Sequence, residues 1–292
     1  MSKKQITGIV IAVAAIAIYF GVKMYASDIA EKKVKEAVAK ASNFADIEYK
    51  KVTVDLFGLN AHISDILVSQ KDNKKKTKID EIIIYDIDSK SETPTFISLK
   101  FKGIHMDIKD FRLSKENLSG FRKLGYKDKM KVNLDIDYKY DKEKKDLDIK
   151  KLGLGIDDFG EINLSYSLGD IGSDQIAMLM FAPHKSTVTL KDAKIIYKDH
   201  SLADSLIKLA AEKEGKNIKD FKESMLKDID KELDTKNDEF AKAAYKEIKK
   251  FINDPKEISI SISPSNPETL GNIIRTRKAE KLIKMLNIKI KS

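Results

Sequence analysis

The sequence contains no cysteine. Without thiols the chain forms no disulfide, carries no thiolate nucleophile and builds no cysteine-ligated zinc finger. This composition is compatible with either side of a membrane. The absence therefore excludes types of chemistry and does not locate the protein.

Arginine is scarce, because only four of the 55 basic residues are arginines and the others are lysines. Nucleic-acid sites rely on the arginine fork for bidentate contacts, and no basic stripe interleaved with aromatic residues is present. We therefore predict no nucleic-acid partner. The net charge of +9 is spread along the chain, and its lysines favour contact with anionic lipid.

Charge is also absent between Lys4 and Lys23, where Ile, Val and Ala dominate. A run of this length approaches the thickness of a bilayer core and predicts a membrane anchor over residues 1–26. The alternative is a cleaved signal peptide, but Met24 stands where a small residue is required before cleavage. We favour the uncleaved anchor.

The orientation of this anchor follows from the basic residues on either side of it. Lys3 and Lys4 indicate an amino terminus inside, with the body in the periplasm and the anchor as a single pass through the inner membrane. A strict count of positive charge after the run gives the opposite orientation. That count rests on Lys23, Lys32, Lys33, Lys35 and Lys40.

Hydrophobic periodicity divides the rest of the chain. Residues 27–45 have the spacing of an amphipathic connecting helix, and residues 46–292 are expected to form one extracytoplasmic domain. Within it, residues 46–199 alternate with a period of two, whereas residues 200–292 are mainly helical with short strands. The lysine-rich "QKDNKKKTK" is expected to be a hairpin loop, and "EISISIS" is expected to be a strand. Ser201 is the expected N-cap of the first helix after His200, and Asn266 is the expected cap of the last helix. The predicted fold class is α+β, with an N-terminal transmembrane helix and a long antiparallel amphipathic β-sheet meander. A C-terminal helical group packs on the meander and ends in a short returning strand.

No catalytic, metal-binding or cofactor-binding residue is predicted. The aspartates between Lys131 and Leu168 alternate with apolar residues and share the solvated face with lysines, without the glycine turn of a calcium loop. The histidines lack metal-binding spacing, so we predict a protein that is not an enzyme. A cleft in which His62, His105 or His184 meets two carboxylates would favour an enzyme instead.

The apolar side of the same strands is the candidate binding site. The helices after His200 are expected to cover it, and any uncovered part would form an apolar groove next to the membrane. The apolar segment Gln175–Pro183 either bridges two strands in the core or lines this groove. The candidate groove residues are Leu134, Ile136, Tyr138, Leu154, Ile156, Leu164, Tyr166, Met178 and Met180.

Two stretches carry a resemblance to a known family. "YKKVTVDLFGLNAHISDILVS" and "LDIDYKYDKEKKDLDIKKLGLGIDDFGEINLSYSLGDI", together with the N-terminal run, resemble AsmA-like single-span envelope proteins of Gram-negative bacteria. The helical block from His200 onward departs from that pattern. The resemblance implies periplasmic placement and a role in phospholipid transport or envelope maintenance, and it supplies no catalytic residues.

The predicted function is that of a membrane-anchored extracytoplasmic protein that binds or guides lipid. The alternative is a structural protein that docks a partner in an envelope complex. The expected partners are the membrane, phospholipid and envelope proteins, and no cofactor is expected.

Overall fold

The structure is a computed structural model. It describes residues 31–292 except 33, 37, 40, 41, 43, 44, 56–59, 71, 72, 89, 90, 92, 93, 112, 113, 115–118, 121, 126, 127, 236 and 237. The predicted anchor over residues 1–26 lies outside the described residues. Of the helices that the structure describes, none is both long and apolar enough to cross a membrane.

The described chain is mostly antiparallel β-sheet with a few helices, so the predicted α+β fold class is wrong. The chain divides into two compact units. Unit 1 comprises the described residues up to Lys139 and Leu152–Asp157, and unit 2 comprises Tyr140–Lys151 and Asp158–Ser292. We describe each unit by itself.

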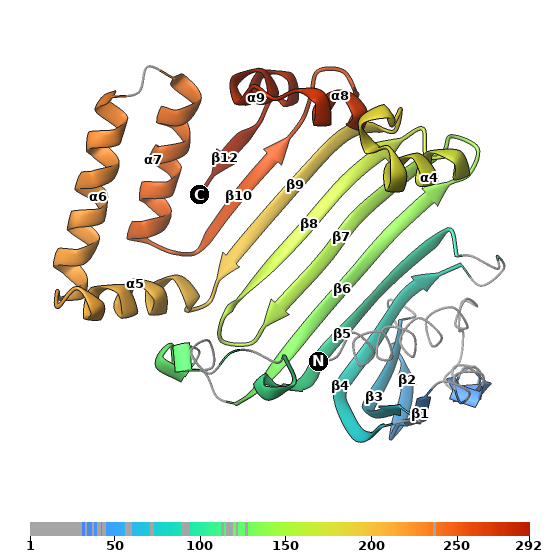
Figure 1. The fold of residues 1–292 in the computed structure, drawn as a ribbon. Coiled ribbons are helices and arrows are strands. Elements are labelled where there is room, and N and C mark those ends of the chain that lie inside the picture. Colours follow the sequence, from blue (N-terminus) through green and yellow to red (C-terminus); the bar gives the residue numbers. More distant parts are fainter. Residues whose placement is uncertain are drawn as a thin grey trace. The chain divides into compact units, whose positions relative to one another are not determined.

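Unit 1 is built on neighbouring antiparallel strands in the order β1-β3-β4-β5-β6, with β2 also paired to β3 (Figure 1). Strands β6 and β7 each contribute residues to both units. The elements are β1 (Ala45–Glu48), β2 (Lys51–Val54), β3 (Ala61–Gln70), β4 (Asn73–Ile87), β5 (Phe96–Asp107), the 3-10 helix η1 (Ile108–Phe111), β6 (Lys129–Asp141) and β7 (Asp146–Ile156).

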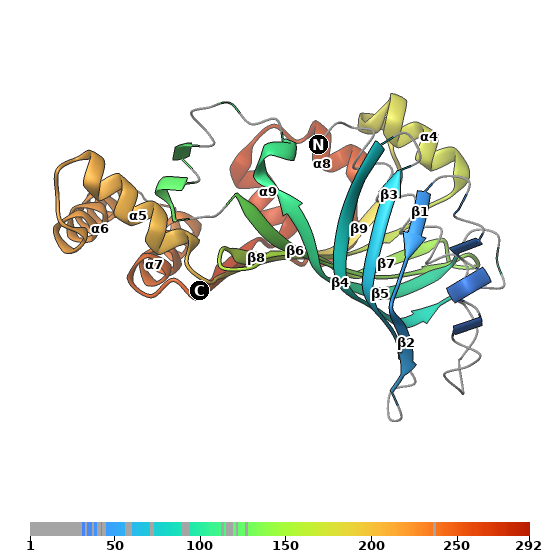
Figure 2. The same cartoon turned by 90° about the horizontal axis from the view of Figure 1, so that it is seen from below.

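The core of unit 1 contains a shift in strand parity that crosses three strands. Core side chains stand three positions apart on β3, β4 and β5, whereas regular strands alternate every second residue. The three-residue spacings lie side by side on the neighbouring strands, because Ile82 pairs with Ile63 on β3 and with Phe101 on β5. Strand β4 follows a curved path (Figure 2), as expected for an irregular sheet. The pairs of core residues are Ile63 and Ile66, Ile79 and Ile82, and Phe101 and Ile104.

Unit 2 has strands in the order β8-β9-β10-β12, with β11 paired to β9. Its elements are β8 (Gly160–Gly169), α4 (Ser173–Phe181), the 3-10 helix η2 (Pro183–Lys185), β9 (Thr189–Asp199), α5 (Leu202–Lys213), α6 (Ile218–Thr235), α7 (Glu239–Asn253), β10 (Glu257–Ile262), β11 (Glu268–Thr269), α8 (Leu270–Arg275), α9 (Ala279–Leu286) and β12 (Lys289–Lys291).

The helices of unit 2 do not form the layer over the sheet that the predicted fold class required. Helix α7 contacts β10 and β12, whereas α6 packs on α7 and α5 packs on α6. In Figure 1 this group extends beyond the edge formed by β12. The apolar faces of α5 and α6 pack against each other, because Ile207 and Ala211 of α5 form a buried cluster with Phe221 of α6.

Three local predictions also differ from the structure. The lysine-rich segment expected as a hairpin loop is strand from Asn73 onward, and Lys76 in this strand pairs with Glu48 at 2.8 Å. The apolar segment expected to bridge two strands in the core is helix α4, and its last residue, Phe181, is 84% exposed. The helix expected to begin after Asn266 begins after Thr269, whose hydroxyl accepts from Asn272 N at 3.1 Å.

Candidate functional site: an exposed apolar face in unit 2

Three cross-strand rows of apolar residues line one face of the unit 2 sheet. In the central row, Leu164 is opposite Ile195, and Ile195 is opposite Ile260. Strand β12 extends this row with Ile290. Residues directly opposite in a sheet project to the same side, so all three rows share one face. We call this the isoleucine face; it comprises Ile162, Leu164, Tyr166, Ala193, Ile195, Tyr197, Ile258, Ile260, Ile262 and Ile290.

Much of the isoleucine face is open to solvent. Ile162, Ile195 and Ile260 are 48%, 45% and 42% exposed, and they come from three neighbouring strands. Single exposed apolar residues are ordinary, but contiguous ones mark binding surfaces in soluble proteins. Because the three isoleucines lie in adjacent rows, they form one contiguous exposed surface.

Helix α7 covers one end of this face. The ring of Phe251 packs edge-on against Tyr197, with ring centroids 6.0 Å apart. The Tyr197 hydroxyl donates to Asp199 Oδ1, and the same oxygen accepts from Ala203 N in the first turn of α5 at 2.9 Å. Ser201 occupies the N-cap position of α5, as predicted, but its side chain makes no capping hydrogen bond and its hydroxyl donates to the carbonyl of Asp158.

The opposite face of the same strands is mainly polar. Glu161 pairs with Lys151 at 3.7 Å and accepts a hydrogen bond from Asn163 Nδ2 at 2.6 Å. Lys198 pairs with Glu257 across β9 and β10 at 3.8 Å. The sheet of unit 2 is therefore amphipathic, and only one of its faces offers an extended apolar surface.

The predicted groove residues divide between the two units. In unit 2, Leu164 and Tyr166 are half-buried members of the isoleucine face, as the alternation predicted. Met178 is half-buried in α4, and Met180 lies in the same helix. Ile195 and Ile260 were not among the predicted groove residues, although the alternation in "EISISIS" indicates a strand with one apolar face.

In unit 1 most of the predicted groove residues pack against the hydrophobic core. Leu134, Ile136 and Ile156 are partly buried and pack against the buried cluster. The Tyr138 hydroxyl donates to the carbonyl of Pro94 at 3.0 Å; burial raises the pKa of Tyr138, and nearby Asp88 adds to that effect. Leu154 is 45% exposed.

Unit 1 also contains a histidine that meets two carboxylates. His62 Nδ1 lies 2.7 Å from Glu81 Oε1, and His62 Nε2 lies 3.4 Å from Asp55 Oδ2. Glu81 also accepts from Lys102 at 2.8 Å. The residues of this network come from β3, β4, β5 and the position that follows β2. We therefore interpret it as a structural network that links neighbouring strands. Among the described residues, no group of histidines and carboxylates is arranged to hold a metal ion.

A second network centres on Asp80, the neighbour of Glu81 at the parity shift. Asp80 Oδ1 lies 2.7 Å from His105 Nε2, and Asp80 Oδ2 accepts from Lys131 Nζ at 2.7 Å. Partial burial opposes ionisation, but the hydrogen bonds from Lys131 and His105 outweigh it and lower the pKa of Asp80 to about 2. Both networks bind strands to one another and need no ligand for charge balance.

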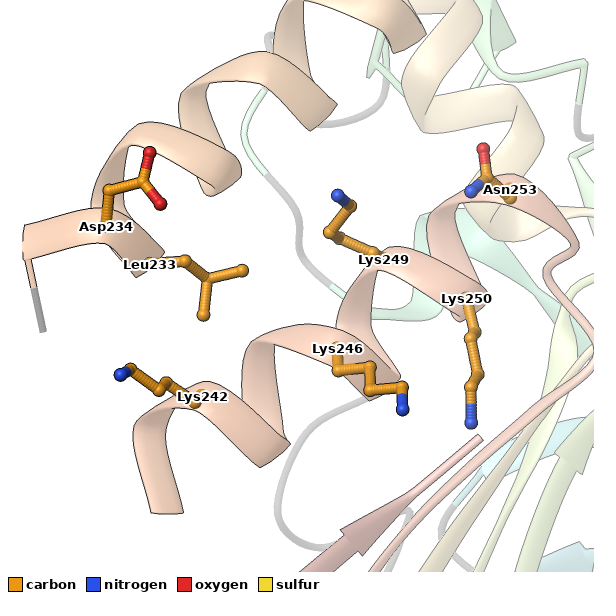
Figure 3. A pocket seen from close by; sticks show the side chains of 7 residues that line it. All are labelled: Leu233, Asp234, Lys242, Lys246, Lys249, Lys250 and Asn253. Carbon is orange, nitrogen blue, oxygen red and sulfur yellow. The ribbon is translucent and has the colours of Figure 1, made fainter. Parts of the chain in front are cut away.

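A hollow of about 660 Å³ lies between α6 and α7 (Figure 3). Lys249 is paired with Asp230 and Lys250 with Glu247, and the other lining lysines are exposed. We interpret the hollow as a solvated groove between two amphipathic helices. Its lining residues are Leu233, Asp234, Lys242, Lys246, Lys249, Lys250 and Asn253.

The comparisons with known proteins concern mainly unit 2. A family model described as "Uncharacterized protein" matches residues 153–292, which is somewhat less than half of the chain. This match contains the whole isoleucine face and does not reach the ion networks of unit 1. No curated protein matches the chain. Nothing in these comparisons links the chain to AsmA-like proteins, so that resemblance stays a prediction.

Proposed function

We propose that this protein attaches to a membrane and binds lipid acyl chains on the isoleucine face. The observation that carries the proposal is the contiguous exposure of Ile162, Ile195 and Ile260 on three neighbouring strands. Each methylene group removed from water contributes about 0.8 kcal/mol, so an acyl chain lying across the rows gains affinity along its length.

The shape of the face supports an extended apolar ligand. Neighbouring strands lie about 4.8 Å apart, and the central row from Leu164 to Ile290 crosses four of them. Helix α7 bounds one end of the face through Phe251. An elongated chain fits such a surface better than a compact polar molecule does.

Membrane attachment is supported by the sequence alone. The uncharged run between Lys4 and Lys23 supplies a hydrophobic segment of the kind that enters bilayers. We place the protein at the inner membrane with its body in the periplasm, where a lipid-binding surface would serve envelope maintenance. The alternative is that the isoleucine face docks an envelope protein.

The proposal is tested by photocrosslinking from single cysteines in the full chain. Because the natural sequence has no cysteine, each introduced thiol is the only one. A photoactivatable label at Ile195→Cys is expected to capture phospholipid at least about tenfold more than one at Lys194→Cys, since burial of a side chain of this size contributes about 1.5–3 kcal/mol. Both positions are exposed, but they project to opposite faces of β9.

Ile260→Cys provides the second measurement, because Ile260 lies in the same row on another strand. It should capture lipid as Ile195→Cys does. Equal capture at positions 194 and 195 would refute the lipid site. Predominant capture of one protein at both isoleucine positions would favour the docking alternative.

A further inference from the structure

Two further exposed apolar side chains lie on α4 and α8, both of which contact η2. Phe181, the last residue of α4, is 84% exposed, and Ile274 of α8 is 51% exposed. These side chains belong to unit 2 but not to the isoleucine face.

Backbone contacts hold the two segments together. Gly271 N donates to Ser186 O at 3.1 Å, and Leu270 N donates to Val188 O at 2.8 Å. A Cβ atom on Gly271 would lie 2.6 Å from Ser186 O and 2.9 Å from His184 O, so only glycine permits this approach. Figures 1 and 2 both show α4 and α8 at the same end of the unit 2 strands.

Cations outnumber carboxylates at this end. Residues 174–187 and 268–280 contain four Lys or Arg and three carboxylates, those of Asp174, Glu268 and Glu280. All four cations are exposed. Two of them are arginines, although the whole chain has only four. We define the α4–α8 patch as Phe181, Lys185, Ile274, Arg275, Arg277 and Lys278.

We infer that the α4–α8 patch docks on the surface of an anionic lipid bilayer. An exposed aromatic ring and an isoleucine enter the boundary between headgroups and acyl chains, while the surrounding cations contact lipid phosphates. Arginine matches phosphate geometry with its planar fork, which lysine does not. This contact goes beyond the proposed function and does not require the isoleucine face to hold a lipid.

The test uses the full chain with a local probe, because bulk vesicle binding would also report insertion of the N-terminal uncharged run. An environment-sensitive NBD label at Phe181→Cys replaces one ring with another. Its emission should rise and shift to the blue with vesicles that contain about one third phosphatidylglycerol, and not with phosphatidylcholine alone. Salt at about 0.5 M should weaken the response by screening.

Charge reversal then assigns the response to the patch. R275E/R277E/K278E should require at least about tenfold more anionic lipid for the same emission. The matched control is K208E/K213E/K219E, which changes the same charge at exposed positions of α5 and α6, beyond the other end of β9. This control should respond as the unmodified chain does. Far-UV circular dichroism and melting establish that both triple variants fold.

Two results would overturn the inference. One is an emission that is the same on neutral and anionic vesicles, or that the control substitutions reduce as strongly as the patch substitutions do. The other is an equal response to soluble polyglutamate, which would assign the patch to an acidic polypeptide. Failure of lipid capture at Ile195, in contrast, would concern only the isoleucine face.

Discussion

Unit 1 and unit 2 bury their apolar residues in different ways. In unit 1 the core residues of β3, β4 and β5 form a closed cluster, where Ile79 is 0% and Phe101 is 1% exposed. In unit 2 the regular rows on β8, β9 and β10 leave Ile162, Ile195 and Ile260 more than two-fifths exposed. Strands with similar apolar content therefore produce a core in one unit and a surface in the other.

The difference arises from strand regularity and from what covers the strands. The parity shift in unit 1 places Ile79 and Ile82 in the same cluster, with Asp80 and Glu81 between them held in ion networks. In unit 2 the alternation is regular across the three apolar rows, because the register shift between β8 and β9 falls at Ser167 and Leu168, beyond these rows. Helix α7 covers one end of the face, whereas α6 packs on α7 and α5 packs on α6. An amphipathic strand pattern thus specifies an apolar face but does not specify its cover.

The largest expected contrast comes from truncating one residue of each unit to alanine. Phe101→Ala should destabilise unit 1 by about 3–5 kcal/mol, because it leaves a cavity in a closed cluster. Ile195→Ala should cost less than about 1 kcal/mol, because the side chain is already 45% exposed. Urea titrations followed by hydrogen exchange, with peptides assigned to each unit, measure both effects.

A large loss of stability in Ile195→Ala would mean that the isoleucine face is covered in the free protein, and the comparison between the units would fail. The matched control is Ile79→Ala, which removes a second fully buried side chain from unit 1. It should destabilise unit 1 by about 2–5 kcal/mol.

The next contrast uses one glycine from each unit. Gly103 and Gly215 both have positive φ, at 62° and 66°, so alanine strains the backbone at either position. At Gly103 the new Cβ would also lie 2.3 Å from Asp80 Oδ2, whereas nothing lies within 4 Å at Gly215. We expect Gly215→Ala to cost about 1 kcal/mol and Gly103→Ala to cost about 2–3 kcal/mol. Equal losses in thermal melting would show that Asp80 moves aside freely.

Acid should weaken unit 1 through Asp80. Its pKa is lowered from 3.8 to about 2, so the folded state prefers the charged carboxylate. The resulting stability is fully present above about pH 4 and is lost as pH falls through 2. With solvent screening taken into account, the contribution is on the order of 1–2 kcal/mol. Asp80→Asn should flatten the difference in urea midpoint between pH 2 and pH 5, and an unchanged pH dependence would contradict the assignment.

Much of the secondary structure was predictable because it depends on local periodicity. Alternation located the long strands, and the 3.6-residue period located α5, α6 and α7. The lysine-rich segment after Gln70 was predicted wrongly, because ion pairs of Lys76 and Lys78 with carboxylates on other strands allow it to extend β4. Local patterns carry no information on such partners.

The candidate site was predictable only in part for the same reason. The alternation placed Leu164 and Tyr166 on an apolar face, but strand pairing decides which residues join them. Leu134 and Ile136 have an equivalent alternation and are packed against the core of unit 1. His62 and Glu81 are 19 residues apart in the sequence, and the register between β3 and β4 brings their side chains into contact. No spacing rule predicts such a contact.

The smallest expected effect concerns the ion pair of Lys249 with Asp230, which crosses from α7 to α6 beside the hollow. The lysine and aspartate side chains are 29% and 54% exposed, so water screens their attraction. Lys249→Gln should cost less than about 1 kcal/mol, and about 1 M salt should remove most of that cost. A salt-resistant loss in urea titrations would mean that the hollow is closed to solvent in solution. In that case an ion pair would stabilise the helices of unit 2, as the Asp80 network stabilises the strands of unit 1. Stabilising ion networks would then no longer distinguish the two units.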